Sequence, residues 1–199
     1  MVSTTRVGRH PSTSRAELGH IALELFVENG FDETTIDDIA AAAGIGRRTF
    51  FRYFTSKNDL PWGDFEELLG GMRASLRQLP DDMPIVDALR SAVISFNSFP
   101  AEEIPFHRQR MALILNSPTL VAHSTLRYAA WRNVVSDFVA HRLGVTASSL
   151  EPQAMAWALL GVSMSAYEQW LGDEDSELID LLESAYRMLN TSFDSRRKD

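Results

Sequence analysis

Residues 44–57 read GIGRRTFFRYFTSK and combine four basic side chains, four aromatic rings and no acidic group. A helix has 3.6 residues per turn, so Phe50 and Phe54 lie on one face of a helix through this stretch. Arg48 and Arg52 then lie on the opposite face. The spacing predicts a short helix that is anchored by its rings and presents its arginines outward.

A second short helix precedes this stretch in the sequence TTIDDIAAAAG, residues 34–44. Thr35 is a candidate N-cap, and Asp38 three positions later completes an approximate capping box. The joint between the two helices is only Gly44-Ile45-Gly46, which is typical of a helix-turn-helix. Solvated arginines on a plain amphipathic helix are the alternative, but the cap and the glycine turn favour the helix-turn-helix.

This arrangement suits double-stranded DNA, because an α-helix fits the major groove and arginine pairs bidentately with guanine. Arg47 and Arg48 lie in the first turn, the part of a recognition helix that reaches base edges. Tyr53 and Lys57 lie further along, where they suit phosphates. The predicted DNA contacts are Thr35, Arg47, Arg48, Arg52, Tyr53 and Lys57, with Arg6 and Arg9 from the segment before the first helix.

The charge of the whole chain restricts any contact with DNA to a local surface. The 199 residues have a formal charge of −8, of which −1 falls in residues 1–60 and −7 in residues 61–199. Such a chain is not expected to coat nucleic acid indiscriminately. There is no cysteine, no apolar signal segment and no apolar run long enough for a membrane span. We therefore expect a cytoplasmic protein without a thiolate metal site or a cofactor.

Helical periodicity runs through nearly the whole chain and predicts an all-α fold of about nine helices. Strand alternation and hairpin turns are scarce. The expected helices are 14–29, one capped at Thr35 and ended by Gly44, 47–54, 56–79, 84–98, 104–116, 118–143, 149–171 and 175–192.

Residues 14–60 resemble the DNA-binding domain of the TetR family of bacterial transcriptional regulators. The matching motifs are Phe26-x3-Gly30-Phe31, Thr34-Thr35-Ile36, Ile39-Ala40, Ala43-Gly44-Ile45, Thr49-Phe50-Phe51-Arg52-Tyr53-Phe54 and Ser56-Lys57. By position, the resemblance implies DNA contacts at Thr35, Arg47, Arg48, Thr49, Phe51, Tyr53 and Lys57. Phe51 departs from the usual tyrosine and lacks its hydroxyl, and Gly46 replaces the usual serine N-cap.

Four further stretches are similar to the TetR-type regulators of mycofactocin gene clusters in actinobacteria: RTFFRYFTSKNDLPWGDF, FNSF…HRQRM, HSTLRYAAWR and AYEQWL. The resemblance implies a flexible basic arm in 1–13, a helix-turn-helix domain in 14–60, and a ligand-binding and dimerisation domain in 61–199. It also implies a ligand-responsive repressor that binds a pseudo-palindromic operator as a homodimer. An effector of the acyl-CoA kind is compatible with it.

The helix expected at 149–171 is apolar nearly all round, as is typical of a helix buried on two sides. Its small residues form one seam and Met155, Leu159 and Val162 form another, so that one seam would face the core and the other a two-fold partner. The alternative is that this helix and the one expected at 175–192 both pack within the core of one monomer. The residues predicted at a four-helix dimer interface are Ala154, Ala158, Gly161, Ser165, Leu178 and Leu182.

The ligand pocket is predicted from aromatic, methionine and basic residues, all of which could equally be ordinary core. His107, Arg110 and Met111 share one helical face, which would place positive charge at the mouth of an apolar cavity. That charge suits an amphiphile with an anionic end. The full predicted set is Phe106, His107, Arg110, Met111, Tyr128, Trp131, Met155 and Met164.

Two other classes of protein are alternatives to a regulator. Enzymes are disfavoured, because the chain lacks a phosphate-loop continuation after Gly46 and a Gly-x-Ser-x-Gly elbow. His123 and His141 are also too far apart along one helix to share a metal. A small-molecule or acyl-CoA carrier with a vestigial helix-turn-helix is the remaining alternative, and the outward arginines argue against it.

Overall fold

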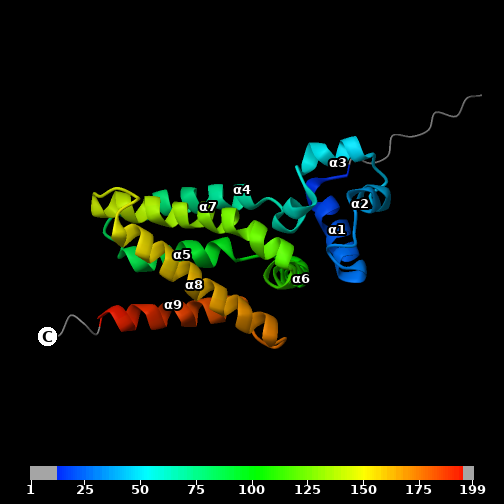
Figure 1. Ribbon diagram of the computed structural model, residues 1–199. Helices are drawn as coiled ribbons and strands as arrows, with labels where there is room; N and C mark the ends of the chain where they lie inside the picture. The colour runs from blue at the N-terminus through cyan, green and yellow to red at the C-terminus, as the bar shows by residue number, and fades with distance from the viewer. Residues whose placement is uncertain (1–12, 195–199) are drawn as a thin grey trace, which may run out of the picture. The chain divides into compact units, whose positions relative to one another are not determined.

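The computed structural model describes residues 13–194, with side chains to residue 189, and within this range it contains helices and no strand (Figure 1). The all-α prediction is confirmed. The α-helices are α1 (Arg15–Asn29), α2 (Ile36–Ala42), α3 (Arg47–Tyr53), α4 (Phe65–Gln78), α5 (Ile85–Phe96), α6 (Ile104–Asn116), α7 (Pro118–Leu143), α8 (Leu150–Gly172) and α9 (Leu178–Asp194), with 3-10 helices η1 (Lys57–Trp62) and η2 (Ala101–Glu103).

Local caps set several of the helix ends. Ser14 begins α1 in a capping box with Glu17, and Thr35 begins α2 in the box predicted with Asp38. Gly144 ends α7 in the left-handed region, with φ +68°, where a residue without a Cβ is favoured. Each of these helix ends depends on a few neighbouring residues, and the sequence predicted their positions correctly.

The single helix expected over 56–79 is wrong. The chain instead forms η1, turns at Gly63 with φ +51°, and begins α4 at Phe65. Pro61 lies inside η1, where it cannot donate a backbone hydrogen bond, and Gly63 takes a conformation that ends the helix. The expected start of the last helix at 175 is also early, because Asp173 and Ser176 form a turn before α9.

The chain divides into two compact units between Gly63 and Asp64. In the N-terminal unit, α1, α2, α3 and η1 enclose a small core. Its most deeply buried side chains include Leu18 and Phe26 of α1, Ile39 of α2 and Phe50 of α3. This core fixes the helix-turn-helix as one body.

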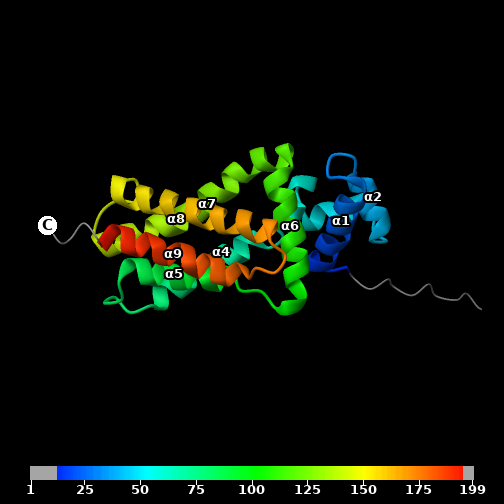
Figure 2. The same cartoon turned by 90° about the horizontal axis from the view of Figure 1, so that it is seen from below.

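The C-terminal unit is a bundle of α4 to α9. Helix α8 packs on α7 and α9, and α5 packs on α4 and α9. Figures 1 and 2 show α8 and α9 running along one side of this bundle, with α4 on the other side. No helix in residues 13–194 meets the length and apolarity needed to cross a bilayer.

Candidate DNA-binding helix and effector site

Aromatic rings anchor α3, as the sequence predicts. Phe50 is fully buried and Phe54 is 2% exposed, and their ring centroids are 6.1 Å apart. The guanidinium of Arg15, from α1, lies 4.3 Å from the centroid of Phe54. Because the inner face of α3 is enclosed in this way, its outer face has a fixed direction.

The outer face of α3 presents Arg48 and Arg52, whose side chains are exposed. Neither forms a hydrogen bond or ion pair with a residue in the described range. Phe51 is 45% exposed on the same helix, and Thr49 is half-buried. The geometry predicted for this helix is therefore present: rings inward, arginines outward.

Arg47 differs from Arg48, because it is already paired. Its Nη1 lies 2.8 Å from Oδ2 of Asp37 on α2, and both side chains are more than half exposed. Its guanidinium also lies 5.7 Å from the centroid of Phe51. Asp37 could not be recognised from the sequence, because an exposed aspartate in the first turn of a helix is common and gives no separate signal.

Lys57 is hydrogen-bonded within the N-terminal unit. Its ammonium donates to the carbonyl oxygens of Phe31 at 2.6 Å, Thr34 at 2.9 Å and Asp32 at 3.3 Å. An ammonium has three hydrogens, so this turn uses all of them. Lys57 therefore ties η1 to the turn between α1 and α2, and its contact with a phosphate stays a prediction.

The hydroxyls of Thr35 and Tyr53 also donate within the chain. Thr35 donates to Oδ2 of Asp38 at 2.6 Å, and this bond lowers the pKa of the Asp38 carboxyl. Tyr53 donates to the carbonyl oxygen of Thr13 at 2.5 Å. Neither hydroxyl hydrogen is free for a phosphate in this state. The predicted contacts Arg6 and Arg9 lie outside the described residues.

A directional chain of hydrogen bonds runs through the interior of the C-terminal unit. Asn97 donates to the carbonyl oxygen of Val93 at 2.7 Å, and its Oδ1 accepts from the Tyr167 hydroxyl at 2.5 Å. The Tyr167 oxygen lies 2.9 Å from Nε2 of His107. Since Tyr167 has already donated its hydrogen, Nε2 must be the donor and His107 is the neutral Nε2–H tautomer.

Burial reinforces the neutral state of His107. It lowers the pKa of the imidazole to about 3, and the nearby charge of Arg110 lowers it further. Burial also raises the pKa of the Tyr167 hydroxyl. The prediction that His107 contributes positive charge to a pocket mouth is therefore wrong, because the sequence could not reveal how deeply the ring is enclosed.

Arg110 is the cation that remains near this chain of bonds. Desolvation lowers the pKa of its guanidinium, and the charge of Glu103 acts in the opposite direction. No hydrogen bond or ion pair joins Arg110 to another residue in the described range. A largely desolvated guanidinium without a bonded carboxylate is suited to receive an anionic group.

The other predicted pocket residues come from three neighbouring helices. Trp131 and Met111 are buried, and the rest are half-buried. They are Phe106 and Met111 on α6, Tyr128 and Trp131 on α7, and Met155 and Met164 on α8. Helix α6 packs on both α7 and α8. Of the eight predicted residues, His107 lines a cavity of about 190 Å³ together with Phe99, Trp170 and Leu178.

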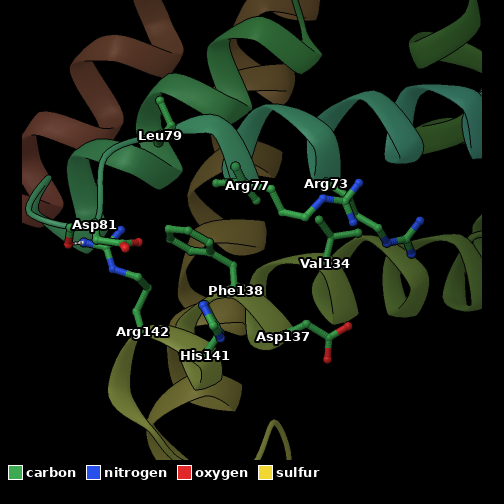
Figure 3. A pocket seen from close by; sticks show the side chains of 10 residues that line it. Arg73, Arg77, Leu79, Asp81, Val134, Asp137, Phe138, His141 and Arg142 are labelled. Atoms are coloured by element: carbon green, nitrogen blue, oxygen red, sulfur yellow. Dashed lines mark hydrogen bonds between the residues drawn. The ribbon is translucent and has the colours of Figure 1, made fainter.

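A second cavity, of about 340 Å³, lies between the C-terminal parts of α4 and α7. Figure 3 shows the Phe138 ring pointing into it and Arg142 reaching toward the loop at Asp81. Arg142 donates to the carbonyl oxygens of Asp81 and Met83. The lining of this cavity contains both arginines and aspartates. Basic residues are favoured at helix C-termini, so the arginines here are explained without a ligand.

The small seam of α8 is left uncovered by the chain itself. Ala154, Gly161 and Ser165 are exposed and Ala158 is half-buried. Beside the seam, Val162 and Ser165 of α8 line an apolar groove of about 220 Å³ with Ala185, Met188 and Leu189 of α9.

Leu178 and Leu182 were predicted at the same interface and must be removed from it. Leu178 is 5% exposed and Leu182 is fully buried inside the protomer. The buried face of α9 continues to Tyr186, whose hydroxyl lies 3.0 Å from that of Ser163. A side chain that is already buried in the protomer cannot bury further apolar surface against a partner. Any interface formed by α9 would therefore use the face opposite to these buried residues.

Comparisons with known proteins give the same family for both units. The model for bacterial regulatory proteins of the tetR family matches residues 20–60. The model for the MftR C-terminal domain matches residues 83–194. The chain is 44% identical over 194 residues to MftR of Mycobacterium tuberculosis, named for transcriptional regulation of mycofactocin biosynthesis, and the match covers 98% of each chain.

Solved structures share the fold at low identity. FadR of Thermus thermophilus, a repressor in complex with lauroyl-CoA, has a TM-score of 0.56 at 24% identity and covers 88% of this chain and 93% of its own. FadR of Bacillus subtilis, in complex with stearoyl-CoA, has a TM-score of 0.61 at 18% identity, covering 88% and 97%. With two family models matched and a relative aligned almost end to end, the chain belongs to the TetR family of bacterial transcriptional regulators.

Proposed function

We propose that this protein is a ligand-responsive transcriptional repressor that binds a pseudo-palindromic operator as a homodimer. The observation that carries the proposal is the orientation of α3: Phe50 and Phe54 are buried, and Arg48 and Arg52 project outward without a hydrogen bond or ion pair to a described residue. Each recognition helix would enter one half-site, with the half-sites about one turn, roughly 34 Å, or a multiple of it apart. Family membership favours this function over a carrier.

The dimer would form through α8 and α9 of each protomer. The uncovered small residues Ala154, Gly161 and Ser165 allow close approach of a second helix. The exposed apolar side chains beside them, Trp157 and Met188, would gain burial. A two-fold arrangement satisfies both, since the same patch serves both partners.

The effector would be an amphiphile with an anionic end, of the acyl-CoA class. Arg110 supplies the cation, and the half-buried Tyr128 and Met155 lie on the helices that pack with α6. The two FadR structures, which share this fold, hold lauroyl-CoA and stearoyl-CoA. His107, being neutral, would contribute hydrogen bonding and ring contacts rather than charge.

Regulation would follow from two states of the dimer that differ in how well the recognition helices match the operator. An effector can shift that equilibrium only by its difference in affinity for the two states, typically about 1–3 kcal/mol of coupling. Helix α4 directly follows the Gly63 junction, so a displacement of α4 is the expected link between the effector site and the helix-turn-helix.

The test is fluorescence anisotropy with a labelled duplex from the DNA upstream of the protein's own gene, titrated with lauroyl-CoA. We expect binding of the duplex and its release by lauroyl-CoA, with free CoA as the control. The Arg110→Gln variant should bind the duplex normally and need at least tenfold more lauroyl-CoA. Failure of the wild-type protein to bind any upstream duplex would refute the regulator; binding that lauroyl-CoA leaves unchanged would refute only the effector class.

A further inference from the structure

The basic stretch 47–57 presents less charge than its sequence suggests. Of its four cations, Lys57 gives its three hydrogens to the carbonyls of the turn at residues 31–34. Arg47 is paired with Asp37. Arg48 and Arg52 are therefore the two members of the stretch that keep their charge free, within the residues that the structure describes.

We propose that Asp37 is a positioning residue for DNA specificity, which directs Arg47 toward a base edge and away from phosphates. The proposal rests on the proposed function, since it concerns the same DNA-binding surface. Asp37 holds Arg47 through one contact, between Oδ2 and Nη1 at 2.8 Å. The hydrogens on Nη2 and Nε of Arg47 remain available for the bidentate contact that arginine makes with guanine.

The ion pair itself is weak, and this is why it can act as a selector. Asp37 is 67% exposed and Arg47 is 57% exposed, so solvent screens the attraction between them. Binding to DNA of arbitrary sequence depends mainly on contacts with phosphates. A phosphate that binds the free edge of Arg47 lies beside the Asp37 carboxylate, and the two negative charges repel each other. A guanine edge carries no net charge and meets no such repulsion. At the operator, a base can bind Arg47 while Asp37 stays in place.

The other acidic groups in this part of the chain do not share this arrangement. Asp38 is committed to the capping box with Thr35. Glu33 is exposed in the turn before α2 and forms no bond to an arginine in residues 13–189, so it serves as a control of equal charge. Substitution at Asp37 leaves the capping box of α2 intact.

The experiment measures binding to the operator duplex and to a random-sequence duplex of equal length at several potassium chloride concentrations. Asp37→Asn should bind the random duplex about three- to fivefold more tightly, the range expected for freeing one exposed ion pair. The slope of log affinity against log salt should steepen by about 0.9 for each recognition helix that gains a phosphate contact. Operator affinity should stay the same or fall, so that the ratio of operator to random binding decreases.

Three variants separate this role from a general charge effect. Glu33→Gln removes the same charge and should leave the affinity ratio unchanged. Asp37→Glu, which keeps the carboxylate, should retain the wild-type ratio of operator to random binding and the wild-type salt slope. In an Arg47→Ala background, Asp37→Asn should have no effect on either. Equal responses of Asp37→Asn and Glu33→Gln would overturn the proposal, as would an effect that persists without Arg47.

The same titrations distinguish this inference from the proposed function. Wild-type protein that binds neither duplex refutes DNA binding, and with it the role of Asp37. Wild-type protein that prefers the operator, with Asp37→Asn showing the same preference and salt slope, refutes the role of Asp37 alone.

Discussion

His107 donates its Nε2 hydrogen to the oxygen of Tyr167, 2.9 Å away, although the two residues are sixty positions apart in the chain. The Tyr167 hydroxyl in turn donates a hydrogen bond to Oδ1 of Asn97. Hydrogen bonds of fixed direction therefore join α6, α8 and the end of α5. The His107 ring also contacts two other aromatic rings: its centroid lies 4.3 Å from that of Phe99 and 5.6 Å from that of Trp170. This enclosure keeps the imidazole neutral.

The first prediction concerns stability against pH. The pKa of His107 is about 3 in the fold and about 6.5 in the unfolded chain, so between these values the unfolded chain binds a proton that the fold does not. The free energy of unfolding should therefore fall as the pH is lowered from 7 toward 4. The contribution of His107 approaches about 1.4 kcal/mol per pH unit. Denaturant unfolding at several pH values measures it.

His107→Gln keeps an amide hydrogen that can reach Tyr167 and removes the titrating group. Its unfolding free energy should depend less on pH than that of the wild-type protein. His141→Gln, at an exposed position, is the matched control. If His107→Gln and the wild-type protein lose stability in parallel, His107 is not the group responsible.

The second prediction assigns Lys57 to folding. Lys57→Met keeps a long aliphatic side chain and removes the ammonium, which lies 4.5 Å from the centroid of the Phe31 ring and donates to three backbone carbonyls. We expect a loss of about 1–3 kcal/mol in the stability of the N-terminal unit, as for hydrogen bonds to charged groups. Faster hydrogen exchange at residues 31–35 would report it. Arg52→Met, which removes an exposed cation from the same unit, should leave that exchange unchanged.

The third prediction concerns base reading by Arg48. Arg48→Ala should cost about 1–3 kcal/mol of operator affinity and relax the preference at one base pair. A binding-site selection with the variant protein measures both effects. Arg77→Ala, an exposed arginine of α4, is the control. Unchanged affinity and selectivity for Arg48→Ala would mean that another surface reads the DNA.

The fourth prediction places the two-fold interface. A Cβ at Gly161 would meet no atom within 4 Å in the protomer, so Gly161→Leu fits the isolated chain. In a close helix pair the added side chain should cost about 1–3 kcal/mol, which weakens dimerisation about 5- to 150-fold. Sedimentation at several concentrations measures it. Gly70→Leu, which is equally unobstructed on α4, should leave the dimer intact; equal effects of the two would move the interface elsewhere.

The amino-acid sequence by itself determined what depends on neighbours a few positions apart. Thr35 and Asp38 specify the start of α2, Gly144 specifies the end of α7, and the spacing of Phe50 and Phe54 specifies the buried face of α3. Caps, glycine conformations and helical period are local properties, so a short window contains the information they need.

Only the tertiary structure decided which charged and polar groups remain free. Lys57 and Arg48 are both basic residues of the same short stretch. Lys57 donates to backbone carbonyls more than twenty residues away, whereas Arg48 forms no such bond. His107 loses its charge because Tyr167 and Trp170 enclose it, and Leu182 turns inward because α9 packs on α5. Hydrogen-bond partners and desolvation come from segments that are distant in the chain, and no local pattern states where those segments will lie.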